Sequence, residues 1–229
     1  MGAMKLMVIN PNSSETVTSS IMDSARRAAS PGTELVAVTT KGGTRNVDSA
    51  FADYLSGAYM IRTCLDAAAL HRPDAVVLAG FGRVGIDALK EALTIPVVSI
   101  AEASMAMACL LGHRFTTLTM LQQFIPYQQD LVRYYGFEAK CASVCAININ
   151  VEECVTDRDR TLRELTAQIE RIVADDRAEV VILACAGLCG YDAELSRRAG
   201  VPVLDPVSVS YTQSPSPRDR QKSRMPSSA

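Results

Sequence analysis

Cys185 is the residue whose type and position in this sequence point most directly to catalytic chemistry. It follows an apolar run, Val180 to Ala184, and precedes Ala186-Gly187, where small residues allow a tight turn into a helix. Backbone N–H groups at such a turn stabilise an anion, and a thiolate stabilised in this way moves protons near neutral pH. Most free cysteines are instead small buried apolar side chains, so a catalytic and a structural interpretation both stay open here.

A second run in the chain has the same form as the one that contains Cys185. Residues 74–82 read DAVVLAGFG and residues 179–187 read EVVILACAG, and each run is followed by a short helical pattern and a Pro-Val pair. The repeat implies two similar lobes related by a pseudo-twofold axis. Ligands of open α/β sheets bind at the carboxyl ends of the strands. We therefore expect Gly80 and Cys185 to face each other across a cleft between the lobes.

The elements that must position these residues alternate between short β-branched runs and longer alanine-rich segments of helical period. This alternation predicts an α/β fold with mostly parallel sheets flanked by helices. We place the first lobe at residues 1–101, with a return of residues 205–212, and the second lobe at residues 102–204. The expected strands are residues 5–10, 34–40, 74–82, 96–100, 115–120, 140–149, 179–187 and 201–204, and the expected helices are residues 14–29, 48–71, 85–93, 101–111, 126–135, 158–174 and 192–199.

Composition and charge exclude several classes of partner. The formal net charge of the 229 residues is -2, so no basic face for nucleic acid is expected. The longest apolar runs have the length of strands, so we expect no contact with a membrane. Seven cysteines without a secretory signal predict free thiols in the cytoplasm. We expect no metal, because His71 and His113 are not at ligand spacing from a cysteine pair. The expected partners are a small-molecule substrate and further copies of the chain, in a homo-oligomer.

Four motifs, in this order along the chain, resemble those of one enzyme family. Residues 9–14 read INPNSS, residues 101–103 read AEA, residues 111–119 read LGHRFTTLT and residues 182–188 read ILACAGL. Together they resemble the hydantoin and allantoin racemases of the aspartate/glutamate racemase superfamily, from about residue 5 to residue 207. The resemblance implies two Rossmann-like lobes, no cofactor, and two cysteines that act as opposed acid and base at the α-carbon of a hydantoin-like ring.

One of the two cysteines that the resemblance implies is missing. Cys185 matches the second, but Gly80 stands at the position of the first, and Arg83 and Val84 replace an aspartate and a proline of the family motif. A racemase without the first cysteine needs another proton carrier, and Cys64, Cys109 or a water molecule are the candidates. Malonate-type decarboxylases of the superfamily also have glycine at this position and keep only the second cysteine.

Three functions follow from the resemblance and the missing cysteine. The leading expectation is a cofactor-independent racemase acting on hydantoin, allantoin or a related activated carbon acid, through an enolate or carbanion that Cys185 protonates. A single-cysteine decarboxylase or isomerase of the same superfamily is the first alternative. A catalytically impaired protein that only binds a small molecule is the second.

The resemblance indicates Asn10, Ser13, Thr119 and Met120 as substrate contacts, and the position of the two strand-end loops beside the cleft adds the others. The expected substrate-binding residues are Asn10, Ser13, Phe81, Gly82, Arg83, Thr119, Met120, Ala186 and Gly187. Backbone N–H groups near Gly82 and Gly187 would stabilise the developing enolate or a carboxylate. Asn10 and Ser13 have an equally good alternative role in turning the chain and capping the first helix. Arginines such as Arg83 are usually surface residues.

The C-terminal part of the sequence departs from the family pattern. The family has an apolar helix after Asp205-Pro206-Val207, whereas this chain continues with Ser210-Tyr211-Thr212-Gln213. We expect this helix to be replaced, which would expose apolar surface and lower stability unless an oligomer contact covers it. Residues 213–229 are rich in Ser, Pro, Arg and Lys and are expected to be disordered.

Overall fold

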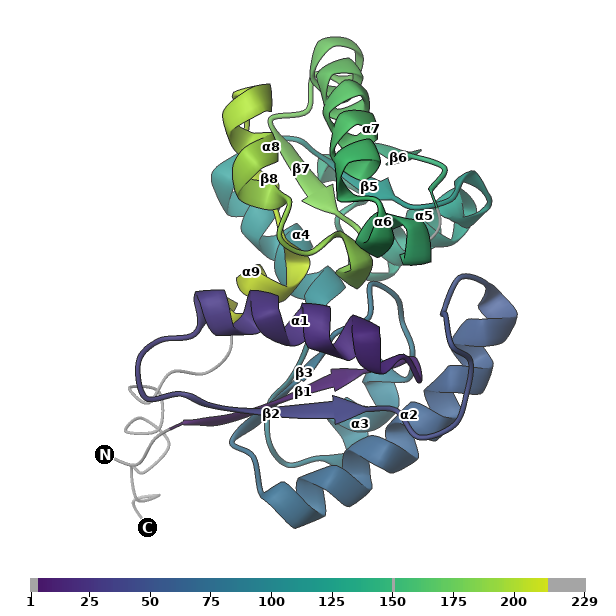
Figure 1. The fold of residues 1–229 in the computed structure, drawn as a ribbon, viewed down its shortest axis with the longest axis vertical. Coiled ribbons are helices and arrows are strands. Elements are labelled where there is room, and N and C mark those ends of the chain that lie inside the picture. Colours follow the sequence, from purple (N-terminus) through teal and green to yellow (C-terminus); the bar gives the residue numbers. More distant parts are fainter. Residues whose placement is uncertain (1–3, 150, 214–229) are drawn as a thin grey trace.

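Two parallel sheets form the centres of two lobes in the computed structural model, which describes residues 4–149 and 151–213. The lobes are stacked along the long axis of the molecule (Figure 1). The first sheet has the order β2-β1-β3-β4, and its strands are β1 (Lys5–Asn10), β2 (Glu34–Thr39), β3 (Ala75–Leu78) and β4 (Val97–Ser99). The second has the order β6-β5-β7-β8, and its strands are β5 (Phe115–Thr119), β6 (Cys141–Ala146), β7 (Val180–Leu183) and β8 (Val203–Leu204).

The equivalent strand orders confirm both the predicted fold class and the predicted repeat. Every strand pair is parallel, and β3 and β7 occupy corresponding positions in their sheets. The helices are α1 (Glu15–Ala28), α2 (Ala50–His71), α3 (Ile86–Ala92), α4 (Ile100–Leu111), α5 (Ile125–Tyr134), α6 (Val151–Thr156), α7 (Arg158–Arg171), α8 (Asp192–Ala199) and α9 (Pro206–Gln213). The sequence predicted neither α6 nor α9. In the part of the chain described, no helix combines the length and the apolar character needed to cross a membrane.

Alternate residues of the central strands pack into different cores, which explains why the strands are apolar throughout. In β1, Leu6 and Val8 join a core shared by both lobes, while Met7 and Ile9 face α2 and α3. In β7, the shared core receives Val180 and Ile182, and the opposite face packs inside the second lobe. A strand buried on both faces needs apolar residues at every position. The shared core holds the two lobes together.

Serine side chains fix where several helices begin. Ser14 accepts a hydrogen bond from the N–H of Val17, and Ser49 accepts one from the N–H of Ala52. Each cap satisfies a backbone donor that the first turn of the helix leaves without a partner. Ser14 therefore starts α1 directly after the loop that follows β1, and Ser49 starts α2 directly after the loop that follows β2.

Helix α9 corrects the prediction that the C-terminal helix of the family is replaced. It packs against α1 of the first lobe and α4 of the second, and Val207 and Val209 are buried there. Ser210 is also buried, but its hydroxyl donates to the carbonyl of Pro206 at 2.6 Å, so its polar atom has a partner inside the helix. The expected disorder of residues 213–229 is wrong for Gln213, which ends α9, and residues 214–229 lie outside the described residues.

Asp205 links this last helix to both lobes. Its carboxylate accepts hydrogen bonds from the hydroxyl of Ser24 in α1 and, at 3.0 Å, from the N–H of Gly190. It also accepts from the N–H of Val207 at 2.9 Å, which caps α9. Asp205 is buried, so each of these donors would lose its partner if the carboxylate were removed.

Candidate active site

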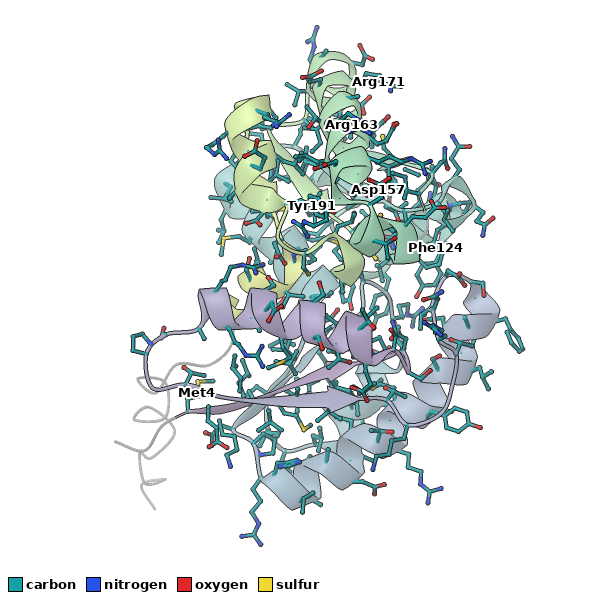
Figure 2. The ribbon with its side chains drawn as sticks, in the orientation of Figure 1. Met4, Phe124, Asp157, Arg163, Arg171 and Tyr191 are labelled. Carbon is teal, nitrogen blue, oxygen red and sulfur yellow. The ribbon has the colours of Figure 1, made fainter. Side chains whose placement is uncertain are left out.

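A cavity of about 340 Å³ lies between the lobes at the carboxyl ends of the central strands. Gly80, which follows β3, and Cys185, which follows β7, both line it, as the internal repeat predicts. The cavity also includes the expected residues Asn10, Phe81, Gly82, Thr119, Met120, Ala186 and Gly187. Phe124, labelled in Figure 2, lines the cavity from the second lobe and was not predicted from the sequence.

Cys185 occupies the junction between β7 and a short 3-10 turn, Ala186–Leu188. Its Sγ accepts a hydrogen bond from the N–H of Gly187 at 3.3 Å. The amides of Gly187 and Leu188 lower the pKa of the thiol, but burial has the larger effect and raises this pKa to about 11. The two amides therefore stabilise a thiolate as expected, but burial has the larger effect on the pKa. Cys185 is a protonated thiol at neutral pH before substrate binds.

The loop after β3 forms the opposite wall and is held from the second lobe. The side chain of Gln128 in α5 donates through Nε2 to the carbonyl of Phe81 at 3.0 Å. A Cβ atom at Gly82 would lie 2.8 Å from the hydroxyl oxygen of Tyr127, so a side chain at this position would displace that hydroxyl. Helix α5 therefore fixes the backbone on the first-lobe side of the cavity.

Asn10 lines the cavity, but hydrogen bonds within the first lobe occupy its polar atoms. Its Nδ2 donates to Oδ1 of Asn12 at 2.8 Å, to Oγ1 of Thr18 at 3.0 Å and to the carbonyl of Ser14 at 3.1 Å, while its Oδ1 accepts from the N–H of Asn12 at 3.1 Å. These bonds shape the loop between β1 and α1. Asn10 thus has the turn-forming role that the sequence left open as an alternative.

Two of the expected substrate-binding residues do not line the cavity. Ser13 is exposed, and its hydroxyl donates to the carbonyl of Thr44. The guanidinium of Arg83 lies over the ring of Tyr134, 3.9 Å from its centroid, and 3.5 Å from the carboxylate of Asp87. The cation–π contact and the ion pair draw this side chain to the surface of α5. The structure corrects the expectation that Ser13 and the Arg83 side chain bind substrate.

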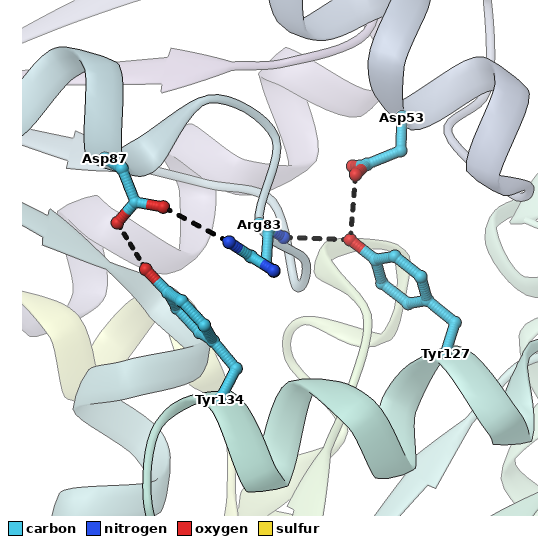
Figure 3. A network of polar contacts seen from close by, with 5 residues as sticks. All are labelled: Asp53, Arg83, Asp87, Tyr127 and Tyr134. Atoms are coloured by element: carbon cyan, nitrogen blue, oxygen red, sulfur yellow. Dashed lines mark hydrogen bonds and ion pairs between the residues drawn. The ribbon is translucent and has the colours of Figure 1, made fainter.

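Asp53, in the first turn of α2, is a cavity residue that the sequence did not indicate. Its Oδ2 accepts a hydrogen bond from the Tyr127 hydroxyl at 3.0 Å, and that hydroxyl accepts one from the N–H of Arg83 at 2.9 Å (Figure 3). Its Oδ1 is buried and has no hydrogen-bond partner. Burial raises the pKa of this carboxyl, while the Tyr127 hydroxyl, the Val84 amide and Arg83 oppose the shift.

A ligand in the cavity would meet carboxylates and amides from the described lining residues, but no cationic side chain. Among the described residues, the lining of the cavity contains Asp48 and Asp53 and no Lys, Arg or His. Cys64 and Cys109, named above as replacement proton carriers, do not line it. Within residues 4–149 and 151–213, no group of three His, Cys, Asp or Glu side chains is arranged to hold a metal ion. The apolar part of the lining consists of Pro11, Val17, Val47, Ala79, Phe81, Val84, Met120, Leu121, Phe124, Ala184 and Ala186.

Comparison with known proteins identifies close relatives along nearly the whole chain. The sequence profile of the Asp/Glu/Hydantoin racemase family matches residues 6–213. The chain is 34% identical to the hydantoin racemase of Paenarthrobacter aurescens over 206 residues, which are 90% of this chain and 87% of that protein. The crystal structure of an allantoin racemase from Pseudomonas fluorescens superimposes with a TM-score of 0.88 at 35% identity, covering 92% of this chain and 88% of that one.

A more distant similarity concerns the fold alone. An arylmalonate decarboxylase structure superimposes with a TM-score of 0.63 at 20% identity, over 91% of this chain and 90% of that one. It has the same arrangement of lobes but a much lower sequence identity than the two racemases.

Proposed function

The chain belongs to the Asp/Glu/Hydantoin racemase family and is a racemase-type isomerase, and from this premise we propose that it inverts the α-carbon of a hydantoin, allantoin or related cyclic amide. In this reaction the α-hydrogen leaves as a proton, and the electron pair of the C–H bond is delocalised into the neighbouring carbonyl as an enolate. A proton returned to the opposite face gives the other enantiomer. The reaction needs proton carriers and donors to the enolate oxygen, all of which are protein groups.

The observation that supports this function best is the position of Cys185. It lines the cavity at the end of β7, with the N–H of Gly187 directed at its sulfur. Because burial raises its thiol pKa to about 11, it holds a proton at neutral pH and is set to deliver that proton to a carbanion. Removal of a proton by Cys185 in the reverse direction needs the thiolate, which the Gly187 and Leu188 amides stabilise.

The charge of the cavity supports a neutral amide ring as substrate. Among the residues described, no cationic side chain lines the cavity, whereas Asp48 and Asp53 do. A free carboxylate would meet these anions without a compensating cation, and burying such an unpaired charge is unfavourable. Ring N–H groups, in contrast, donate to carboxylates. The apolar side chains of the lining suit the substituent on the ring.

Gly80 supports a second candidate function, the release of CO2 from a substituted malonate. Decarboxylation produces the carbanion by loss of CO2, so it needs one protonation and no base on the opposite face. The cavity then requires only Cys185, and no proton carrier is needed at position 80. The absence of a lining cation among the described residues makes this the weaker candidate.

Isotope exchange and optical rotation separate these functions. The purified enzyme is incubated in D2O with each enantiomer of allantoin and of a 5-substituted hydantoin, and deuterium at the α-carbon and loss of rotation are followed against an enzyme-free sample. CO2 release from an arylmalonate is measured in parallel. A racemase incorporates deuterium and loses rotation, and C185S lowers the rate by about 100-fold or more. The matched control C109S alters a half-buried thiol outside the cavity and retains activity. CO2 release without α-hydrogen exchange would replace the racemase proposal by the decarboxylase.

A further inference from the structure

Helix α2 buries an acid and exposes aromatic residues, which is the reverse of what folding stability favours. Asp53 is 7% exposed, whereas its neighbours Phe51 and Tyr54 are 75% and 83% exposed. A carboxylate is almost never fully buried unless it is paired. Asp53 forms no ion pair that would account for its burial, because the guanidinium of Arg83 contacts Asp87. Such an unfavourable position at a cavity indicates a functional role.

Asp53 is also the only buried titratable side chain on the first-lobe side of the cavity, within the described lining. Asp48 lines the same wall but is exposed. Asp53 Oδ1 lies 3.4 Å from the position that a Cβ atom would take at Gly82, two residues after Gly80. The carboxylate is therefore beside the loop where the family has its first cysteine. Cys185 lies on the second lobe.

Hydrogen bonds stabilise the ionised carboxylate of Asp53 at the cavity wall. The Tyr127 hydroxyl accepts from the N–H of Arg83, so its own proton is directed to Asp53 Oδ2. The Val84 amide adds to the stabilisation of the carboxylate, whereas Oδ1 is buried. The substrate must therefore reach the carboxylate from the cavity that Asp53 lines. Burial raises the pKa of the carboxyl and makes it a stronger base than an exposed aspartate.

We propose that Asp53 is the first-lobe acid–base residue of this enzyme and replaces the cysteine missing at Gly80. This inference rests on the proposed racemase function. In one direction the Asp53 carboxylate takes the α-proton, the electron pair of the C–H bond forms the enolate, and the Cys185 thiol protonates the opposite face. The enzyme is left with a carboxylic acid and a thiolate. The other enantiomer reacts by the same steps in reverse, so no other reactant is consumed.

Deuterium exchange measured separately for each enantiomer tests this assignment. D53N keeps the size of the side chain and an oxygen that accepts from Tyr127, but it cannot take a proton. We expect D53N to lower racemisation by about 100-fold or more and to lose exchange from one enantiomer only, while Cys185 still exchanges the other within a few-fold of the native rate. C185S should show the opposite preference. D66N removes an equal charge from an exposed position of the same helix, outside the cavity lining, and should leave both rates within a few-fold.

The outcomes distinguish this inference from the proposed function. If native enzyme exchanges both enantiomers and D53N slows both equally or neither, Asp53 is not the proton carrier although the enzyme is a racemase. If the native enzyme exchanges only the enantiomer that depends on Cys185, the first-lobe base is absent and the assignment is wrong. If it exchanges neither, the proposed racemase function itself fails. Circular dichroism and thermal unfolding of D53N, with D66N beside it, show whether a loss reflects misfolding.

Discussion

A Cβ atom at Gly80 would lie 2.7 Å from Cγ of Pro11, closer than unbonded carbons approach in folded proteins. The loop after β1 therefore fills the space that a side chain at position 80 would need. Both residues line the cavity on the first-lobe side. A cysteine introduced at position 80 would therefore have to displace Pro11 or the loop that carries it.

We predict that G80C destabilises the protein through this contact. Overpacking at a well-filled position costs about 1–3 kcal/mol in the free energy of unfolding. Urea unfolding of G80C, P11A and the double variant measures the coupling between the two positions. The loss caused by G80C should be smaller in the P11A background. Equal losses in both backgrounds would show that Pro11 does not restrict position 80.

We also predict that a cysteine at position 80 restores function to D53N once Pro11 has been shortened. The variant P11A/G80C/D53N has a thiol on the first-lobe face in place of the neutral amide. Its racemisation rate should exceed that of P11A/D53N by at least about tenfold, since a positioned proton carrier contributes about 100-fold or more. A serine at position 80 provides the size-matched control. Equal rates for the cysteine and serine variants would contradict a shared role for positions 53 and 80.

Stability should decrease at alkaline pH in a way that depends on Cys185. The thiol ionises near 9.0 when exposed, whereas burial raises its pKa to about 11 in the folded protein. A raised thiol pKa stabilises the fold below pH 9 and loses this contribution as the pH rises from 9 toward 11. In urea unfolding under reducing conditions, C185A should therefore lose less stability than the native protein over this range. The difference between the two proteins should be constant from pH 7 to 8, where the thiol is protonated in both states.

Tyr127→Phe should move the acidic limb of the pH–rate profile to higher pH. The Tyr127 hydroxyl stabilises the ionised carboxylate of Asp53, so its removal raises the pKa of that carboxyl further. A hydrogen bond to a charged group is worth about 1.5–3 kcal/mol, which corresponds to about one to two pH units. Profiles of kcat/KM between pH 5 and 8 measure the shift. Y134F is the matched control, because its hydroxyl bonds to Asp87 outside the cavity. An unchanged limb in Y127F would contradict the coupling of Tyr127 to the base.

Asp205→Ala should destabilise the joint between the lobes. The change leaves the Ser24 hydroxyl and the N–H groups of Gly190 and Val207 without their acceptor. Each buried donor without a partner costs about 1–3 kcal/mol, so a total loss of at least about 3 kcal/mol is expected. S208A removes one hydroxyl at the same helix start and should cost less than about 1.5 kcal/mol. Similar unfolding midpoints for D205A and S208A would show that Asp205 does not join the lobes.

The sequence was sufficient to predict the two sheets because their central strands are buried on both faces. Runs such as Val180–Leu183 are apolar at every position, and their repetition at residues 74–82 indicated which strand ends would meet. Helices α6 and α9 were missed because Val151–Thr156 and Pro206–Gln213 contain few strong helix formers. Their helical form depends on packing against the rest of the protein.

The parts of the candidate site that consist of sequence neighbours could be predicted. The parts that depend on packing between distant segments could not. Cys185 and Gly187 are neighbours in one turn, so their contact could be expected. Asp53 lies in the first turn of a helix, where an exposed acid is ordinary because it interacts favourably with the helix dipole. Its burial results from Tyr127, which is 74 residues away in the sequence. The outward direction of Arg83 likewise depends on Tyr134 in α5.

The position of α9 sets the order in which the nascent protein can assemble. The whole first sheet leaves the ribosome before β8 and α9 are synthesised, yet α9 packs against α1 of that first lobe. Domains generally fold as units during synthesis, beginning at the N-terminus. The first lobe can thus acquire its sheet while the faces of α1 and α4 that α9 will cover are still open to chaperones. The contact of α9 with α1 and α4, which joins the two lobes that line the cavity, forms only when the last helix has been made.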